Sequence, residues 1–206
     1  MDTNAPILTL HDVVAGYGAM TILNGTSFAV RRATITTVIG PNGAGKSTVF
    51  KTIFGMLKPR SGSILFKGEN ISGMQPRDLL ARGICYVPQG RNIFPELTVR
   101  HNLELGGIAA DRSIDIDARI EAAMQRFPIL RQKQDAQAST LSGGQQKLVE
   151  IARGLLLDPD LILIDEPSIG LSPLMVQEIF QILKDLRAKG VTILTVSYTH
   201  LRAHET

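Results

Sequence analysis

The sequence predicts an α/β fold with a mostly parallel core sheet, and three observations lead to this prediction. Residues 34–39 are β-branched throughout and run directly into a glycine-rich loop and a helix-compatible segment. Residues 161–164 are continuously apolar, which is typical of a parallel strand buried on both faces. Segments with strand character alternate with segments of helical period, which favours right-handed crossovers between parallel strands.

Strands are expected before the glycine-rich loop. Residues 7–14 alternate apolar and polar side chains, as a half-buried strand does, and Gly16-Tyr17-Gly18 is expected to break this strand. A second strand is expected at residues 22–30. Beyond the loop, the expected elements are a helix at 48–57 stopped by Pro59, a strand at 63–66, a short helix at 76–81 and a strand at 84–87.

The middle of the chain changes to a helical pattern. Between residues 98 and 137, apolar side chains recur at helical spacing, for example at Ile116, Ile120 and Met124, and we expect an inserted helical subdomain. The elements expected after it are a helix at 142–157, the buried strand at 161–164, an amphipathic helix at 173–189 closed by Gly190, and a last strand at 191–196.

Composition bounds the class of protein. The chain has 206 residues, 44% of them hydrophobic and 20% charged, which suits one soluble domain with a sizeable core. The net charge is +3 with no long basic run, so nucleic acid is not indicated as a partner. No apolar run has the length of a membrane span, and the N-terminus lacks the features of a signal peptide. The single cysteine, Cys85, lies in an apolar strand and is expected to be a buried thiol in a reducing, cytoplasmic setting.

The glycine-rich loop has the spacing G-x-x-x-x-G-K-[ST] of a phosphate-binding loop. Glycines let the backbone curl until several N–H groups point at one anion, and the helix that follows adds its positive N-terminal end. Lys46 can reach the β- and γ-phosphates, and the Ser47 hydroxyl can ligate Mg²⁺. The residues expected to bind nucleotide here are Gly40, Pro41, Asn42, Gly43, Ala44, Gly45, Lys46, Ser47 and Thr48.

An acidic pair, Asp165 and Glu166, follows the buried strand at 161–164. Ligands gather at the carboxyl ends of parallel strands, so this pair is a candidate second half of a nucleotide site. Asp165 would hold Mg²⁺, directly or through water, and Glu166 would orient and polarise the attacking water. The alternative is an acidic pair on the surface at the end of a strand.

Leu141-Ser142-Gly143-Gly144-Gln145 precedes a predicted helix and is a second candidate anion-binding element. Ser142 is a good N-cap, and the two glycines expose backbone N–H groups. Taken alone, the stretch could be only a capped helix start. Together with the phosphate loop and the acidic pair, however, it resembles the ATP-binding-cassette (ABC) ATPases, whose signature motif it matches without change.

The resemblance covers roughly residues 7–196 and implies a P-loop NTPase core with a small antiparallel β subdomain and a helical subdomain at about 90–157. It also implies a head-to-tail dimer with two ATP molecules, in which the signature of one subunit closes over the ATP of the other. Tyr17 matches the aromatic that stacks on adenine, although a turn tyrosine is the alternative. Gln89 matches the glutamine that reaches Mg²⁺ and senses the transport partner. Ser168–Leu171 lacks the aspartate of many relatives, which puts a carboxylate contact across the dimer in doubt.

Residues 87–99 and 166–173 look like the ATPase subunits of branched-chain amino acid importers, and of close relatives that move urea or short amides. The resemblance therefore implies an ATPase on the cytoplasmic face of the membrane that powers an integral membrane permease fed by a substrate-binding protein. Gln89 and residues 91–99 would meet that permease. Alternatives are a soluble ABC ATPase that acts as a clamp on nucleic acid or ribosomes, and a nucleotide-binding fragment without turnover.

Residues 197–206 do not match the continuation of the family and look like a foreign tail. We therefore expect an ABC ATPase domain at 1–196 that is truncated at its carboxyl end. Counted from the last strand, the switch histidine of the family should fall at Tyr198, not at His200.

Overall fold

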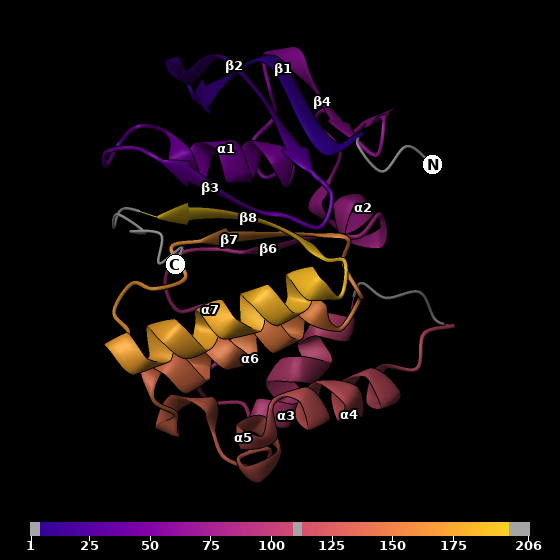
Figure 1. The fold of residues 1–206 in the computed structure, drawn as a ribbon, viewed down its shortest axis with the longest axis vertical. Helices are drawn as coiled ribbons and strands as arrows, with labels where there is room; N and C mark the ends of the chain where they lie inside the picture. The colour runs from indigo at the N-terminus through magenta and orange to yellow at the C-terminus, as the bar shows by residue number, and fades with distance from the viewer. Residues whose placement is uncertain (1–4, 109–112, 198–206) are drawn as a thin grey trace.

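A computed structural model describes residues 5–108 and 113–197 and arranges them in layers (Figure 1). Two four-stranded sheets have the strand orders β2-β1-β4-β5 and β3-β8-β7-β6. Helix α1 (Lys46–Ile53) lies between the two sheets, and helices α6 (Gly143–Leu155) and α7 (Pro173–Ala188) lie on the other side of the second sheet. The α/β fold with a parallel core sheet is confirmed.

The first sheet is antiparallel and consists of β1 (Pro6–Tyr17), β2 (Met20–Arg31), β4 (Ser61–Phe66) and β5 (Glu69–Asn70). The expected break at Gly16-Tyr17-Gly18 is wrong for the first two residues, because β1 runs on to Tyr17 and Tyr17 pairs with Met20 across a hairpin. A Cβ on Gly16 would lie 1.9 Å from the carbonyl oxygen of Met20. Gly16 therefore allows close approach of two backbones inside the hairpin, a role that glycine also has within strands.

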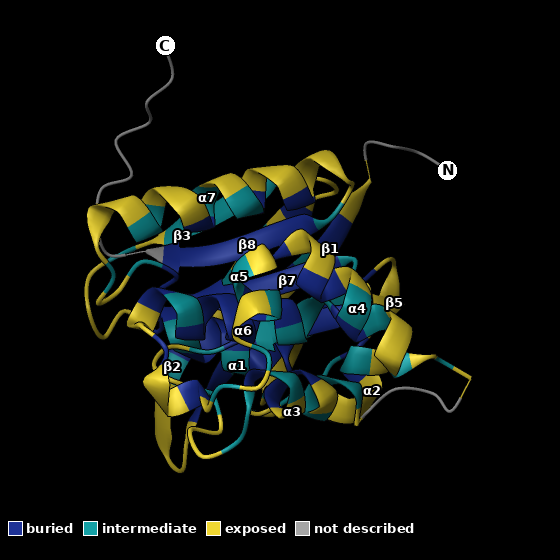
Figure 2. Ribbon diagram, turned by 90° about the horizontal axis from the view of Figure 1, so that it is seen from below, coloured by how far each residue is buried: buried dark blue, intermediate teal, exposed yellow. Residues whose placement is uncertain are grey.

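The second sheet is parallel and consists of β3 (Ile35–Ile39), β6 (Ile84–Val87), β7 (Leu161–Asp165) and β8 (Thr192–Ser197). All five residues of β7 are buried, four of them as predicted from the apolar run at 161–164. In Figure 2, β7 and β8 are coloured as buried and lie in the interior of the molecule. In the described part of the chain, β3 and β6 are the outer strands. The expectations for Tyr198, His200 and the rest of the chain to residue 206 lie outside the described residues.

Several helices begin or end away from their predicted limits. The helix expected at 48–57 is α1, which begins at Lys46 and ends at Ile53, since Gly55 takes a left-handed conformation with φ +72°. The helix expected at 76–81 is α2 (Pro76–Ala81), as predicted. The segment expected to be helical at 98–137 is broken into shorter pieces, and Pro128 begins the last α-helix among them. The pieces are α3 (Val99–Glu104), η1 (Leu105–Gly107), α4 (Ile116–Arg126), α5 (Pro128–Gln132) and η2 (Ala138–Thr140).

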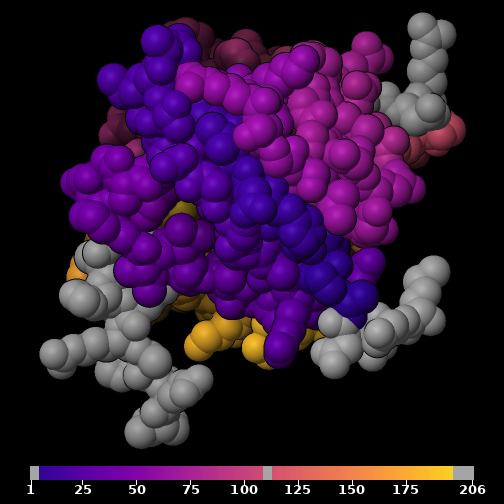
Figure 3. Space-filling view, turned by 90° about the horizontal axis from the view of Figure 1, so that it is seen from above, coloured from indigo at the N-terminus to yellow at the C-terminus, as the bar shows by residue number. Residues whose placement is uncertain are grey.

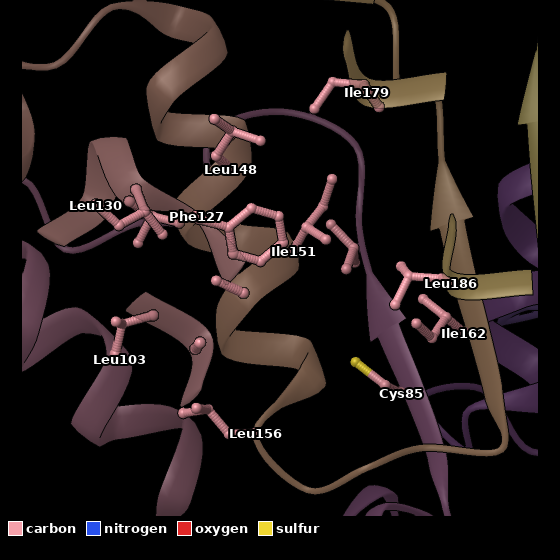
Figure 4. Packing of buried hydrophobic residues seen from close by; sticks show 14 of the residues in the cluster. Cys85, Leu103, Phe127, Leu130, Leu148, Ile151, Leu156, Ile162, Ile179 and Leu186 are labelled. Carbon is pink, nitrogen blue, oxygen red and sulfur yellow. The ribbon is translucent and has the colours of Figure 1, made fainter. Parts of the chain in front are cut away.

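The parallel sheet separates two apolar cores. Along β7, Ile162 and Ile164 face a core shared with α6, α7 and the helical segment, whereas Leu161 and Leu163 face a core shared with α1 and the antiparallel sheet. Figure 4 shows the first of these cores, where Cys85 lies close to Ile162. Burial raises the pKa of the Cys85 thiol to about 12, so Cys85 is a core residue, as predicted.

The N-terminal third of the chain covers the upper face of the molecule (Figure 3). The helical segment lies at the opposite end, beyond α6 (Figure 1). Among the described helices, none is both long and apolar enough to cross a membrane.

Candidate functional site

Three predicted site segments follow the carboxyl ends of parallel strands. The phosphate loop follows β3, Gln89 follows β6, and Asp165 and Glu166 stand at the end of β7. Since these strands run parallel in one sheet, their carboxyl ends meet at one edge. The fold thus brings together residues that are more than a hundred positions apart in sequence.

Left-handed glycines shape the phosphate loop. Gly43 and Gly45 have φ angles of +80° and +86°, which L side chains rarely adopt. A Cβ on Gly45 would also lie 2.9 Å from the Cγ2 atom of Ile22 in the hairpin above. The Ala44 N–H donates to the Pro41 carbonyl oxygen at 3.2 Å, which closes the turn. Residues 41–44 remain exposed, so their backbone is accessible to a ligand.

Lys46 lies against the loop and is only 5% exposed. Its Nζ atom donates to the carbonyl oxygens of Gly40 at 2.6 Å and Pro41 at 2.8 Å. Helix α1 begins here, with Gly45 as N-cap, and within the described residues no side chain caps it. The positive end of the helix therefore points into the loop, where a cavity of about 260 Å³ is lined by Ile22, Gly43, Gly45, Lys46, Ser47 and Thr48. This arrangement suits an anion such as phosphate.

Asp165 has one unsatisfied oxygen deep in the sheet edge. Its side chain is 1% exposed, and its Oδ2 atom is 3.4 Å from the Tyr86 hydroxyl, which donates to it. Over the residues described, its Oδ1 atom is buried without a hydrogen-bond partner. Burial, together with the nearby Asp165 charge, raises the pKa of Tyr86, which keeps Tyr86 protonated as a donor. A buried carboxylate oxygen with no donor is costly, and a divalent cation would satisfy it.

Glu166 is held in an unusual conformation next to Asp165. Its φ angle is +52°, in the left-handed region, and its residue is 3% exposed. Its N–H donates to the Val196 carbonyl oxygen at 3.2 Å, which ties it to β8. Backbone strain of this kind costs of order 1–3 kcal/mol and concentrates at functional sites.

Ser142 caps α6 in a reciprocal arrangement. Its Oγ atom accepts the Gln145 N–H at 3.3 Å, while the Gln145 Oε1 atom accepts the Ser142 N–H at 3.0 Å. Leu141 and Gly144 are buried, and a Cβ on Gly144 would lie 2.4 Å from the Met175 Cε atom. Gly143 is exposed, and a Cβ there would make only an ordinary contact, 3.9 Å from the Leu171 Cδ2 atom. The cavity at the phosphate loop has no residue of this stretch in its lining, and the cavity beside Gly143 has no residue of the phosphate loop in its lining.

The two remaining predicted residues are both exposed. Tyr17 is 47% exposed at the end of the hairpin, and the Lys51 Nζ atom lies 5.8 Å from its ring centroid. Gln89 lies in the turn after β6, where its carbonyl oxygen accepts from Asn92 Nδ2 at 3.3 Å. The sequence reasoning missed Tyr86, although a polar aromatic residue in an otherwise apolar strand is a signal that could have found it.

Comparison with known sequences decides the family. The sequence profile described as ABC transporter matches residues 23–169, which is more than half of the chain. The chain belongs to the ABC transporter family. It is an ABC ATPase, a class whose members bind and hydrolyse ATP.

Relatives of this ABC ATPase are similar over most of its length. The high-affinity branched-chain amino acid transport ATP-binding protein BraG of Pseudomonas aeruginosa is 39% identical, with 92% of this chain and 81% of the relative covered. The probable branched-chain amino acid transport ATP-binding protein LivG of Methanocaldococcus jannaschii is 34% identical, with coverages of 93% and 80%.

Solved structures agree with the fold of this ABC ATPase. A nucleotide-free ATP-binding cassette from an ABC transporter superposes with a TM-score of 0.86 at 33% identity and covers 96% of this chain and 83% of its own. An ATP-binding cassette in its ADP conformation gives a TM-score of 0.84 at 33% identity, with coverages of 94% and 82%.

Proposed function

We propose that this ABC ATPase binds and hydrolyses ATP to power an importer of branched-chain amino acids. The observation that carries the proposal is the joint placement of the phosphate loop, the open Asp165 oxygen and the buried Glu166 at one sheet edge. The cargo follows from relatives, since the two described above are named as branched-chain amino acid transport proteins.

In this proposal, the phosphate loop holds the triphosphate and Tyr17 stacks on adenine. The backbone N–H groups of the loop and the start of α1 face the phosphates. Lys46 exchanges its two carbonyl acceptors, Gly40 and Pro41, for β- and γ-phosphate oxygens. The exposed aromatic face of Tyr17 at the end of the hairpin is available for stacking on a base.

Mg²⁺ would be held by the Asp165 carboxylate and the Ser47 hydroxyl, with Gln89 reaching it from the neighbouring strand end. The donor set supports this, because oxygen ligands with one carboxylate suit Mg²⁺ at a phosphate site. When bound, the ion neutralises charge that develops on the β- and γ-phosphate oxygens. Tyr86 keeps its hydrogen bond to the second oxygen of Asp165 and so orients the carboxylate.

Glu166 would act on the attacking water. A carboxylate buried in the site can orient the water and accept its proton as the γ-phosphate is attacked. The backbone of Glu166 is left-handed and is hydrogen-bonded to Val196 of β8, which holds the Glu166 Cα atom in one position relative to β8.

The site is completed by a second subunit in a head-to-tail dimer. The signature, Leu141–Gln145, has its exposed Gly143 and the N-terminal end of α6 available, and within one chain it does not line the phosphate cavity. We place it over the ATP of the partner, where the helix end would face the γ-phosphate.

A membrane permease would dock on the cytoplasmic side, against the surface around Phe94. An apolar cavity of about 610 Å³ lies between β6, α6 and the helical segment, and Phe94 and Ile108, which line it, are 50% and 78% exposed. An exposed apolar hollow of this kind favours a protein partner. An extracytoplasmic substrate-binding protein would deliver the amino acid to that permease.

The proposal is tested by transport in proteoliposomes that contain the ATPase and the permease that co-purifies with it. We expect ATP-dependent uptake of radiolabelled leucine that unlabelled isoleucine and valine compete away. Competition by urea or acetamide, with none by isoleucine, would instead assign the cargo to the amide class. Phe94→Ser should reduce co-purification with the permease while ATP binding is retained.

A further inference from the structure

Helix α6 carries a buried ion pair that the roles proposed above do not use. The Lys147 Nζ atom and the Glu150 Oε2 atom are 2.6 Å apart, and the two side chains are only 7% and 2% exposed. Taking two charges out of water costs free energy, so a buried pair is a poor source of stability unless further hydrogen bonds satisfy it. The other contacts of these side chains therefore indicate what the pair is for.

The second carboxylate oxygen of Glu150 holds the chain segment after β6. Glu150 Oε1 accepts the backbone N–H of Asn92 at 2.6 Å. One turn further along α6, Arg153 donates from Nη2 to the carbonyl oxygen of the same residue, Asn92. Both main-chain polar groups of Asn92 are thus bound by charged side chains of one helix, and the Arg153 guanidinium also lies 5.9 Å from the Phe94 ring centroid.

Asn92 in turn closes the turn that carries Gln89. Its Nδ2 atom faces the carbonyl oxygens of Pro88, Gln89 and Gly90 at 3.2, 3.3 and 3.4 Å. Gly90 lies within this turn and has a φ angle of +91°, in the left-handed region. The side chain of Asn92 therefore holds the turn against the segment that α6 fixes.

The same helix begins at the signature. Ser142 caps it, and Lys147 follows little more than one turn later. Lys147 and Glu150 line a cavity of about 130 Å³ together with Gly143 of the signature and Arg91 of the Gln89 segment. The contacts form a continuous path from the signature helix through Glu150 and Asn92 to Gln89.

We propose that Glu150 is a positioning residue that fixes the turn carrying Gln89 relative to the signature helix. Hydrogen bonds are directional, so a charged network sets one position for Asn92 where apolar packing would allow several. The inference rests on the proposed role of Gln89 toward Mg²⁺ and deepens it, because it names what holds Gln89 in place.

Two double variants test the acceptor at position 150 and remove Lys147 together with its charged partner, and both leave Arg153 in place. Lys147→Met with Glu150→Leu removes both charges and the acceptor for the Asn92 N–H. Lys147→Met with Glu150→Gln removes both charges but keeps an amide oxygen for that N–H. Measured by hydrogen exchange, the amides of residues 89–94 should exchange about tenfold faster in the first variant and near the wild-type rate in the second. The amides of α4 should not change in either.

A second measurement links the turn to the ion. ATP binding is measured at increasing Mg²⁺ concentration, and the Mg²⁺ concentration at which binding is half-maximal is compared. This concentration should rise several-fold in the double variant with Glu150→Leu and in Gln89→Ala, but not in the double variant with Glu150→Gln. Should the double variants fail to fold, Asn92→Ala removes only the contacts of the Asn92 side chain with the turn. It should likewise speed up exchange at residues 89–94 and raise the Mg²⁺ concentration needed for ATP binding.

The outcomes separate the inference from the function on which it rests. Unchanged exchange at residues 89–94 in the double variant with Glu150→Leu overturns the inference. Faster exchange with unchanged Mg²⁺ dependence also overturns it, provided that Gln89→Ala does alter that dependence. If Gln89→Ala itself has no effect on Mg²⁺, the proposed role of Gln89 fails, while the attachment of the turn through Glu150 is still decided by the exchange data.

Discussion

Lys46 is already hydrogen-bonded before it meets a phosphate, because its ammonium group donates to the carbonyl oxygens of Gly40 and Pro41. It is also buried, so its desolvation cost is met in the folded chain and not during binding. In the proposed function, nucleotide binding would replace these two neutral acceptors by charged phosphate oxygens, and charge-assisted hydrogen bonds are roughly twice as strong as neutral ones.

Lys46→Ala should lower ATP affinity about ten- to a hundredfold, which corresponds to about 1.5–3 kcal/mol for a charged hydrogen bond. The loop backbone and the start of α1 remain in this variant, so some binding should persist. Titration of fluorescent ATP measures the effect, with Lys184→Ala on the exposed side of α7 as a matched loss of positive charge. Equal affinities for wild type and Lys46→Ala would refute the assignment.

Glu166→Gln should abolish most turnover but spare binding. The amide keeps the shape of the side chain but cannot accept a proton, so phosphate release should slow by about 10²- to 10⁴-fold. The ATP affinity of the variant should stay within about threefold of wild type, since the phosphate loop is untouched. Normal hydrolysis by this variant would assign the general base to another residue.

At the scale of elements, the β1–β2 hairpin and the phosphate loop depend on each other. Ile22 of β2 contacts the position where Gly45 would carry a Cβ and lines the phosphate cavity. The exact pairing of the hairpin around Gly16 therefore places one wall of the proposed nucleotide site. A substitution that separates the two strands of the hairpin should lower both the free energy of unfolding and the affinity for ATP.

Gly16→Ala should destabilise the protein by at least about 2 kcal/mol, as expected for overpacking where a backbone atom cannot yield. Its Cβ would meet the Met20 carbonyl oxygen at 1.9 Å. Gly18→Ala, two residues away, is the control: no atom lies within 4 Å, and its φ of +52° costs only about 1–2 kcal/mol. Thermal melting of both variants should rank Gly16→Ala clearly lower, and the reverse order would contradict the hairpin geometry.

Local sequence patterns predict the strands better than their ends. The apolar runs at 84–87 and 161–164 predict β6 and β7 almost to the residue. A strand that is buried on both faces has an unbroken apolar run, and the two ends of the run mark the ends of the strand. By contrast, the prediction that Gly16 breaks the strand is wrong, since its close approach to Met20 depends on how two strands pair, and neither strand's own pattern shows that pairing. No local pattern predicts the two-residue strand β5 either, because it depends on its pairing with β4.

The candidate site divides in the same way. The phosphate loop is a continuous motif that spacing alone predicts. The acidic pair is predicted from its place after a buried strand, and the signature from its match to a motif of the family. Tyr86 behind Asp165 and the Lys147–Glu150–Asn92 path are contacts between distant segments. Only the fold brings those segments together, so the sequence does not show which of them meet, although Tyr86 stands out as a polar aromatic residue in an apolar strand.

At the scale of the whole molecule, the phosphate loop and the signature belong to different ends of the proposed dimer interface. Within one chain, the described cavity at the phosphate loop has no signature residue in its lining. A dimer that depends on ATP is the arrangement that would use both.

Gly143→Arg should block that dimer and leave the monomer intact. Gly143 is exposed at the start of α6, and the nearest atom to a Cβ there is 3.9 Å away, so an arginine fits the folded chain. In the Glu166→Gln background, sedimentation with ATP should show a dimer, and adding Gly143→Arg should return the protein to a monomer with unchanged melting temperature. A dimer that persists in the double variant would place the signature outside the interface.

The position of β8 also governs when the protein can fold during synthesis. β8 stands between β3, which leads into the phosphate loop, and β7, which ends at the acidic pair. The Ala33 N–H, just before β3, donates to the Thr192 side chain, 159 positions later. At about 5–20 residues per second, the ribosome releases β3 roughly 8–30 s before its neighbour β8. Throughout that interval the nascent chain carries an unpaired β-branched strand, so we expect dependence on chaperones until residue 197 emerges, and no protection by ATP before then.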